Sequence, residues 1–146
     1  MYLPRQLQAL QLLRSIKSSF LRQIEPLLRE SGLSLVQTCL LSGVSSGEIE
    51  NINGVCRSLE MGQGNASTMC KKLEQSGLLR RERCQEDERV VRLSLTEPGQ
   101  AALCGVFQRI DERWAAAEED YPQLVQRIID GLEAAEELLR RTEYPS

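Results

Sequence analysis

The sequence predicts a mainly helical protein that carries one small β-hairpin. Apolar residues recur at every third or fourth position through most of the chain, which is the period of an amphipathic helix. Near residues 90–95 the period changes to two, as in a strand with one buried face. Aromatic residues make up only 4% of the 146 residues, so aliphatic side chains must fill the core.

Two helices are expected in the first third of the chain. A continuous apolar stripe predicts a helix over residues 5–30, with a bend at Pro26 because proline removes a hydrogen bond from a helix interior. Ser34 is a favourable N-cap for a second, largely buried helix over residues 35–43. We expect this helix to end near Gly43.

Two shorter helices follow a turn-like segment. Either Asn51 or Asn53 is available to cap a third helix over residues 54–61. The glycines of the GQG sequence are expected to break the chain, so that Asn65 opens a fourth helix over residues 66–77.

A hairpin and two further helices complete the predicted order. Residues 78–84 can pair with residues 90–95 across the polar connection QEDE. Thr96 then caps a fifth helix, and Pro122 separates it from a sixth that ends near Thr142. Two short helices followed directly by a hairpin are typical of a winged helix-turn-helix, here with helices added at both ends.

Charge is distributed unevenly along the chain. The net charge of −3 combines +1 over residues 1–54, +2 over residues 55–96 and −6 over residues 97–146. Seven of the eighteen Lys and Arg residues lie within residues 64–100. An acidic protein can therefore still present a nucleic-acid surface on one face.

The fourth helix and the hairpin carry side chains that suit a DNA duplex. The second helix of a helix-turn-helix enters the major groove, where short polar side chains meet base edges and cations meet phosphates. A wing can place an arginine in the minor groove, and Arg89 lies at the right point, with Asp87 available to orient it. Arg81 and Arg83 alternate on the first strand and are expected to meet phosphates. The candidate DNA-binding residues are Asn65, Ser67, Thr68, Lys71, Lys72, Arg81, Arg83, Asp87 and Arg89.

The same residues also have ordinary explanations. Lys71 and Lys72 are compatible with a simple solvated helix face, and charged residues such as Arg81 and Arg83 protect the edge of a sheet from unwanted pairing. The combination of a basic helix with an adjacent basic hairpin favours DNA binding over these readings.

The five cysteines and the absence of histidine bear on metals, redox chemistry and catalysis. Neither a zinc site nor a disulfide framework is expected, because the cysteines are odd in number and widely spaced. Cys39, Cys56 and Cys104 have apolar neighbours and are expected in the core. Cys70 and Cys84 lie beside cations and are the candidates for a redox role. Without histidine a Ser-His or Cys-His nucleophile is impossible, so no enzyme and no cofactor are predicted.

The central region resembles the MarR family of bacterial transcriptional regulators. The matching elements, in order, are Leu73 and Glu74, Gly77 and Leu78, Arg81 and Arg83, Asp87 and Arg89, and Leu95, Thr96 and Gly99. The resemblance implies a homodimer that binds a palindromic operator, most often as a repressor, and releases it when a small-molecule effector binds. It also implies dimerisation through residues 1–30 and 97–146, with residues 31–96 as the DNA-binding domain.

Two alternatives remain at this point. One is a thiol-based redox-sensing regulator on the same fold, although the peroxide-sensing branch of the family carries its cysteine in the first helix and the first cysteine here is Cys39. The other is a winged-helix protein-interaction module that does not bind DNA. The sequence has neither a signal-peptide pattern nor an apolar run long enough to cross a membrane, which favours a cytoplasmic protein.

Overall fold

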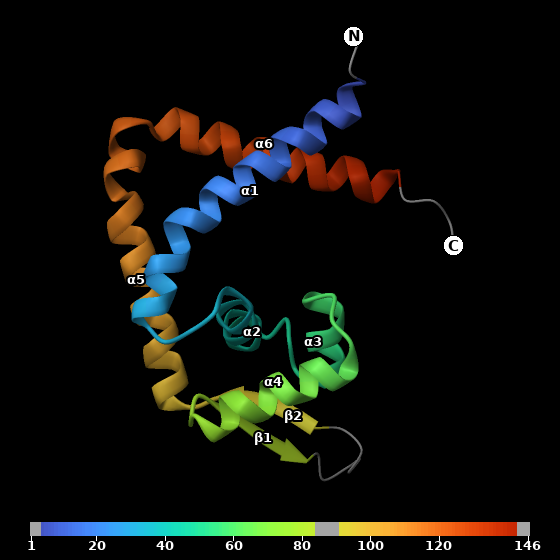
Figure 1. Cartoon of the computed structure of the whole chain (residues 1–146), viewed down its shortest axis with the longest axis vertical. Coiled ribbons are helices and arrows are strands. Elements are labelled where there is room, and N and C mark those ends of the chain that lie inside the picture. The colour runs from blue at the N-terminus through green and yellow to red at the C-terminus, as the bar shows by residue number, and fades with distance from the viewer. Residues whose placement is uncertain (1–3, 84–90, 143–146) are drawn as a thin grey trace. The chain divides into compact units, whose positions relative to one another are not determined.

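The computed structural model describes residues 4–83 and 91–142, and in this part the elements follow the predicted order (Figure 1). The elements are α1 (Arg5–Glu30), α2 (Leu35–Ser46), α3 (Ile52–Ser58), α4 (Gln63–Gln75), β1 (Leu79–Arg83), β2 (Val91–Leu95), α5 (Glu97–Asp120) and α6 (Pro122–Arg141). Contacts divide the chain into one unit of residues 1–109 and another of residues 110–146, which are described separately below. Within the described part, no helix has the length and apolar character needed to span a membrane.

The predicted bounds of the first helix are confirmed, and its end has a clear local cause. Ser31 is the C-cap and Gly32 follows in the left-handed region at φ +72°. Ser34 then starts α2 with a capping box, as its Oγ accepts from the Gln37 N–H at 3.3 Å while Gln37 Oε1 accepts from the Ser34 N–H at 2.8 Å.

The expected end of the second helix was wrong by three residues. Gly43 lies inside α2, which continues to Ser46 and ends at Gly47 with φ +81°. The glycine at 43 serves packing, because a Cβ there would come within 2.5 Å of the Ile49 side chain. A glycine in a helical pattern was mistaken for a stop signal when it is a point of close approach.

The start of the fourth helix was also misplaced. Asn65 does not cap α4: the helix begins at Gln63 with Gly62 as N-cap, and Asn65 is its third residue. Gly62 has φ −68° and Gly64 is helical, so neither glycine uses the left-handed region and neither breaks the chain. For α3 the choice left open is resolved, because Asn51 Oδ1 accepts from the Gly54 N–H at 3.0 Å.

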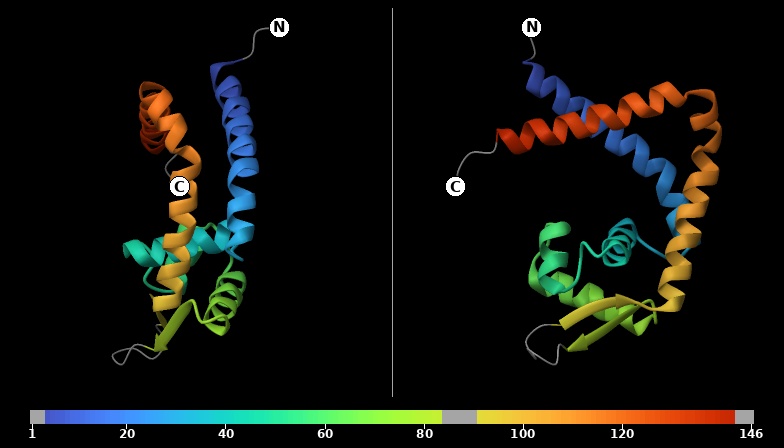
Figure 2. Two further views of the ribbon diagram at one scale, coloured as in Figure 1. Left: turned by 90° about the vertical axis from the view of Figure 1, so that its left-hand side faces the viewer. Right: turned by 180° about the vertical axis from the view of Figure 1, so that it is seen from behind.

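The two strands form the antiparallel hairpin that the alternation predicted. Leu79 faces Leu95 and Arg81 faces Leu93 in the register of β1 and β2. The Leu93 N–H donates to Glu50 O at 2.8 Å, which fastens β2 to the segment before α3. Figures 1 and 2 show α4 lying alongside the hairpin, and α4 packs on β1.

A shared core holds the first unit together. Its buried apolar side chains are Ile24, Leu28, Leu33, Leu40, Leu41, Ile49, Val55, Ala66, Cys70, Leu73, Leu79, Leu93, Leu103 and Val106. These come from α1 to α4, the hairpin and the first part of α5, and the loop residues between them. The core therefore fixes the fourth helix and the wing against one another.

The beginning of α5 is fixed against the start of β1. Thr96 Oγ1 accepts from the Gly99 N–H at 3.0 Å and donates to Gly77 O at 2.6 Å. A Cβ on Gly99 would lie 1.9 Å from Leu78 O, so only glycine fits there. These contacts explain why threonine and glycine occupy their positions in the Leu-Thr-x-x-Gly element.

The second unit contains the end of α5 and all of α6. None of the residues of α6, which the structure describes in full, is buried. Its large apolar side chains recur at helical spacing and are exposed: Leu124, Ile128, Ile129, Leu132, Leu138 and Leu139. Exposed apolar stripes of this kind are typical of interaction surfaces.

Candidate nucleic-acid interface

The fourth helix separates its side chains cleanly into two faces. Ala66, Cys70 and Leu73 are buried at the spacing of one helix face. Most of the predicted DNA-binding residues of α4 are exposed, namely Asn65, Thr68, Lys71 and Lys72, while Ser67 is half-buried. The helix thus presents polar and cationic groups outward on a backbone that its apolar face holds in place.

The predicted residues of the hairpin divide between two environments. Arg83 is exposed at the end of β1, whereas Arg81 is half-buried on the same strand. Cys84, Asp87 and Arg89 lie outside the described residues. α4 packs on β1, so the two elements that carry these residues are neighbours in the structure.

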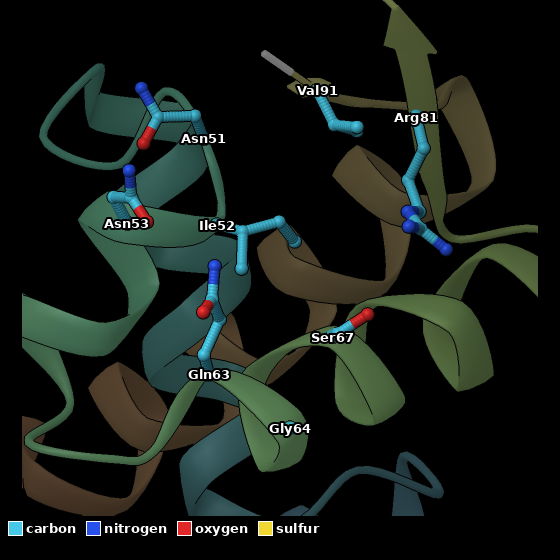
Figure 3. A pocket seen from close by; sticks show the side chains of 8 residues that line it. All are labelled: Asn51, Ile52, Asn53, Gln63, Gly64, Ser67, Arg81 and Val91. Atoms are coloured by element: carbon cyan, nitrogen blue, oxygen red, sulfur yellow. The ribbon is translucent and has the colours of Figure 1, made fainter. Parts of the chain in front are cut away.

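Arg81 is paired with the fourth helix. Its Nη1 lies 3.6 Å from Glu74 Oε2, and its side chain is only 22% exposed. Figure 3 shows the side chain extending from β1 toward α4. Within the described part of the chain, its Nε is buried and has no hydrogen-bond partner. The sequence pattern does not predict this pairing, because the two residues belong to different elements.

A polar hollow of about 510 Å³ opens between the beginnings of α3 and α4 and the wing (Figure 3). Its lining residues are Asn51, Ile52, Asn53, Gln63, Gly64, Ser67, Arg81 and Val91. Amide, hydroxyl and guanidinium groups on this lining can donate and accept hydrogen bonds. The sequence singled out Asn51 and Asn53 as helix caps but gave no sign that they line a hollow together with Gln63.

The cysteines are arranged differently from the expectation. Cys39 and Cys104 are exposed and Cys56 is half-buried, so placing Cys39 and Cys104 in the core was wrong. The reason is geometric: Cys104 follows the buried Leu103, but successive helix residues point about 100° apart. Cys104 Sγ instead accepts a hydrogen bond from Gln100 Nε2 at 3.6 Å.

Cys70 has the most perturbed environment of the described thiols. Burial raises the pKa of the Cys70 thiol from 9.0 to about 11, although the nearby Arg81 guanidinium acts in the opposite direction. The thiol therefore stays protonated at neutral pH, and the thiolate is the reactive form of cysteine. This environment does not favour a redox role for Cys70.

Known proteins with similar sequences are transcriptional regulators, and the similarity covers the winged-helix region described above. The family described as "Transcriptional regulator SarA/Rot" matches residues 22–103, which include α2, α3, α4 and the hairpin. The chain belongs to this family. Over 78 residues it is 35% identical to the organic hydroperoxide resistance transcriptional regulator of Bacillus subtilis. That alignment covers 53% of each protein, so this member of the SarA/Rot family matches about half the length of that relative.

Solved structures share the whole fold. MarR of Staphylococcus aureus, in complex with salicylate and kanamycin, has a TM-score of 0.80 at 18% identity, with 94% of each chain covered. A mutant of Staphylococcus aureus MepR bound to an oligodeoxyribonucleotide has a TM-score of 0.65 at 18% identity, covering 86% of this chain and 96% of that one. The winged helix-turn-helix fold expected from the resemblance to the MarR family is confirmed.

Proposed function

We propose that this member of the SarA/Rot family binds a palindromic DNA operator as a homodimer and represses transcription. The observation that carries the proposal is the two-faced fourth helix, which packs on β1 and buries its apolar side in the core while Lys71 and Lys72 are exposed. An α-helix fits the major groove of B-DNA, and such a helix must be held rigidly to read it. A mutant of MepR, which shares the fold, is bound to an oligodeoxyribonucleotide, and this supports DNA binding by the present chain.

The roles of the candidate residues follow from their chemistry. Lys71, Lys72 and Arg83 are exposed cations suited to phosphates. Asn65, Ser67 and Thr68 offer short donors and acceptors to base edges at the beginning of α4. In this proposal Arg89 enters the minor groove, oriented by Asp87.

Exposed apolar side chains support the homodimer. α6 has no buried residue, and α1 exposes Leu7, Leu10, Leu12, Leu13 and Ile16 along its first half. Exposed apolar stripes of this size are rare on monomers and mark interfaces. We therefore assign dimerisation to residues 1–30 and 97–146 and DNA binding to residues 31–96.

A small-molecule effector and a cytoplasmic location belong to the same proposal. Staphylococcus aureus MarR, which shares the fold, is in complex with salicylate and kanamycin, and this supports a small-molecule effector for the present chain. An aromatic acid such as salicylate is the first effector to test, by measuring whether it weakens DNA binding.

The decisive experiment is selection of bound duplexes from a random DNA pool, followed by affinity measurements over a range of salt concentrations. We expect a palindrome whose half-sites lie about 10 base pairs apart. Replacing Lys71 or Lys72 with Gln should reduce the salt slope by about one each, and Arg89→Ala should weaken operator binding by about 1–3 kcal/mol.

Arg29→Ala is the matched control, because Arg29 is an exposed cation at the end of α1 that pairs with Glu25 at 3.6 Å. It should leave the affinity and the salt slope unchanged. If no duplex is retained even at low salt, the protein-interaction alternative replaces the proposal. If mild peroxide oxidises Cys70 or Cys84 and thereby releases DNA, the redox-sensing alternative replaces the small-molecule effector.

A further inference from the structure

Arg81 lies on the inner face of the wing. In β1 it shares a face with Leu79, which is 2% exposed, and it stands opposite Leu93, which is 5% exposed. The side chain of its neighbour Arg80 is 65% exposed on the other face, against 22% for Arg81. A phosphate ligand needs to reach the DNA backbone, whereas Arg81 is directed into the joint between strand and helix.

The partner of Arg81 is an acidic residue of the DNA-binding helix. Glu74 follows the buried Leu73 near the end of α4, and its Oε2 lies 3.6 Å from Arg81 Nη1. A carboxylate beside a DNA surface opposes phosphate binding by simple repulsion. The position of Glu74 is explained if its carboxylate binds Arg81 within the protein and does not contact DNA.

The other side of the hairpin is already attached to the molecule by its backbone. The Leu93 N–H donates to Glu50 O at 2.8 Å, which joins β2 to the segment before α3. A two-stranded hairpin is marginally stable by itself, so its angle to α4 depends on contacts of this kind. The Glu74–Arg81 pair is an ionic link from the hairpin directly to α4.

We propose that Glu74 and Arg81 form a positioning pair that sets the wing relative to the fourth helix, so that both can engage one operator at the same time. This inference rests on the proposed DNA-binding function and replaces the phosphate-binding role that the sequence suggested for Arg81. The pair contributes to specificity without touching DNA, since two correctly spaced contacts are needed for the operator but not for nonspecific attachment.

Substitution of Glu74 distinguishes a phosphate-binding role of Arg81 from a positioning role, because the two roles predict opposite changes in DNA affinity. If Arg81 were a phosphate ligand, Glu74→Gln would remove a negative charge, free the guanidinium and tighten binding to any duplex. If the two residues position the wing, Glu74→Gln loosens the wing and weakens operator binding despite the more favourable charge.

The chain offers a matched control for this charge change. Glu82 lies on the outer face of the same strand and pairs with Arg80 at 3.5 Å, with side-chain exposures of 62% and 65%. Glu82→Gln removes the same charge eight positions from Glu74 without affecting the joint. It should leave operator affinity unchanged or slightly improve it.

The experiment uses the full chain with its selected operator and a scrambled duplex of equal length, measured by fluorescence anisotropy at several salt concentrations. Glu74→Gln and Arg81→Gln should each weaken operator binding by about tenfold, and the double variant should be no worse than the poorer single variant. Binding of Glu74→Gln to the scrambled duplex should change by less than about twofold, and the salt slope should stay the same.

Three results would overturn the positioning role. The first is that Glu74→Gln binds the operator as tightly as Glu82→Gln does. The second is that Arg81→Gln lowers the salt slope by about one. The third is that Glu74→Gln loses the same affinity for the operator and for the scrambled duplex. If either single variant fails to fold, the charge-exchanged double variant Glu74→Arg with Arg81→Glu decides: recovery of specific binding supports the pair, and its absence refutes it. A wild-type chain that selects no duplex refutes the proposed function itself, which is a different outcome.

Discussion

The winged-helix region and the last helix show how one sequence pattern can have two structural outcomes. Both α4 and α6 are amphipathic, but the apolar face of α4 is closed by the chain itself, with Leu73 only 1% exposed. In α6 the corresponding side chains stay open, with Leu132 at 45% and Leu139 at 64% exposed. Periodicity therefore predicts that a helix has an apolar face, but it does not tell which chain covers that face.

This difference implies two separate sources of stability. The region from Leu33 to Val106 has its own buried core, so it should remain folded without a partner. The last helix buries no residue, and in the proposed homodimer it is stabilised by association. Changes in the two regions should thus affect different measurements.

The largest effect is expected from charging the open stripe of α6. Ile128 and Leu132 are 50% and 45% exposed and lie one turn apart. Replacing both with Asp should weaken the dimer by about 4 kcal/mol or more, because two carboxylates would have to be buried in an apolar interface. Sedimentation velocity should then show a monomer at micromolar concentration, while circular dichroism shows that the winged-helix region keeps its fold.

Ala134→Asp is the control for this pair of substitutions. Ala134 is exposed and lies two residues after Leu132, which places it about 160° around the helix from Leu132 and at the edge of the stripe, one turn before Leu138. The control should leave the dimer intact. A wild-type chain that sediments as a monomer would contradict our account of the stripe.

The next largest effect should come from the packed region. Gly99→Ala would bring a Cβ to within 1.9 Å of Leu78 O, so the start of α5 must shift away from β1. We expect a loss of about 3 kcal/mol in the free energy of unfolding, measured by urea denaturation. Gly105→Ala in the same helix has open space around it and should be neutral or slightly stabilising. Equal effects at both positions would contradict the close approach at Gly99.

The sequence predicted the elements well because their signals are local, and it failed where tertiary contacts decide. The capping residue Ser34 and the alternation of β2 need no distant partner, and both were located correctly. Gly43 was misread because its function depends on Ile49 packing against it. The Glu74–Arg81 pair joins a helix to a strand, so no periodic pattern could reveal it.

A smaller effect is expected in the pH dependence of the free energy of unfolding, because the Cys70 thiol is buried in the packed core. The pKa of Cys70 is raised to about 11 by burial, against 9.0 for the exposed group. As the pH rises, the thiol of the unfolded chain therefore loses its proton before the thiol of the folded chain does. The contribution of the neutral thiol to the free energy of unfolding is complete below about pH 9 and is lost as the pH approaches 11.

Cys70→Ala provides the comparison, because the two proteins differ only at this position. Between pH 8 and pH 10.5, the wild-type free energy of unfolding should fall by about 2 kcal/mol more than that of Cys70→Ala. Identical pH profiles for wild type and Cys70→Ala would show that the thiol is not desolvated as the structure indicates.

The smallest effect should come from the capping box at the beginning of α2. Ser34→Ala removes the acceptor of the Gln37 N–H and should lower the free energy of unfolding by about 1 kcal/mol. Ser34→Thr keeps the hydroxyl and should recover most of the loss. Because the cap belongs to the winged-helix region alone, the dimer affinity should not change. A parallel loss of dimer affinity would mean that the two regions are coupled, and the separation between a self-supporting core and a partner-dependent helix would have to be given up.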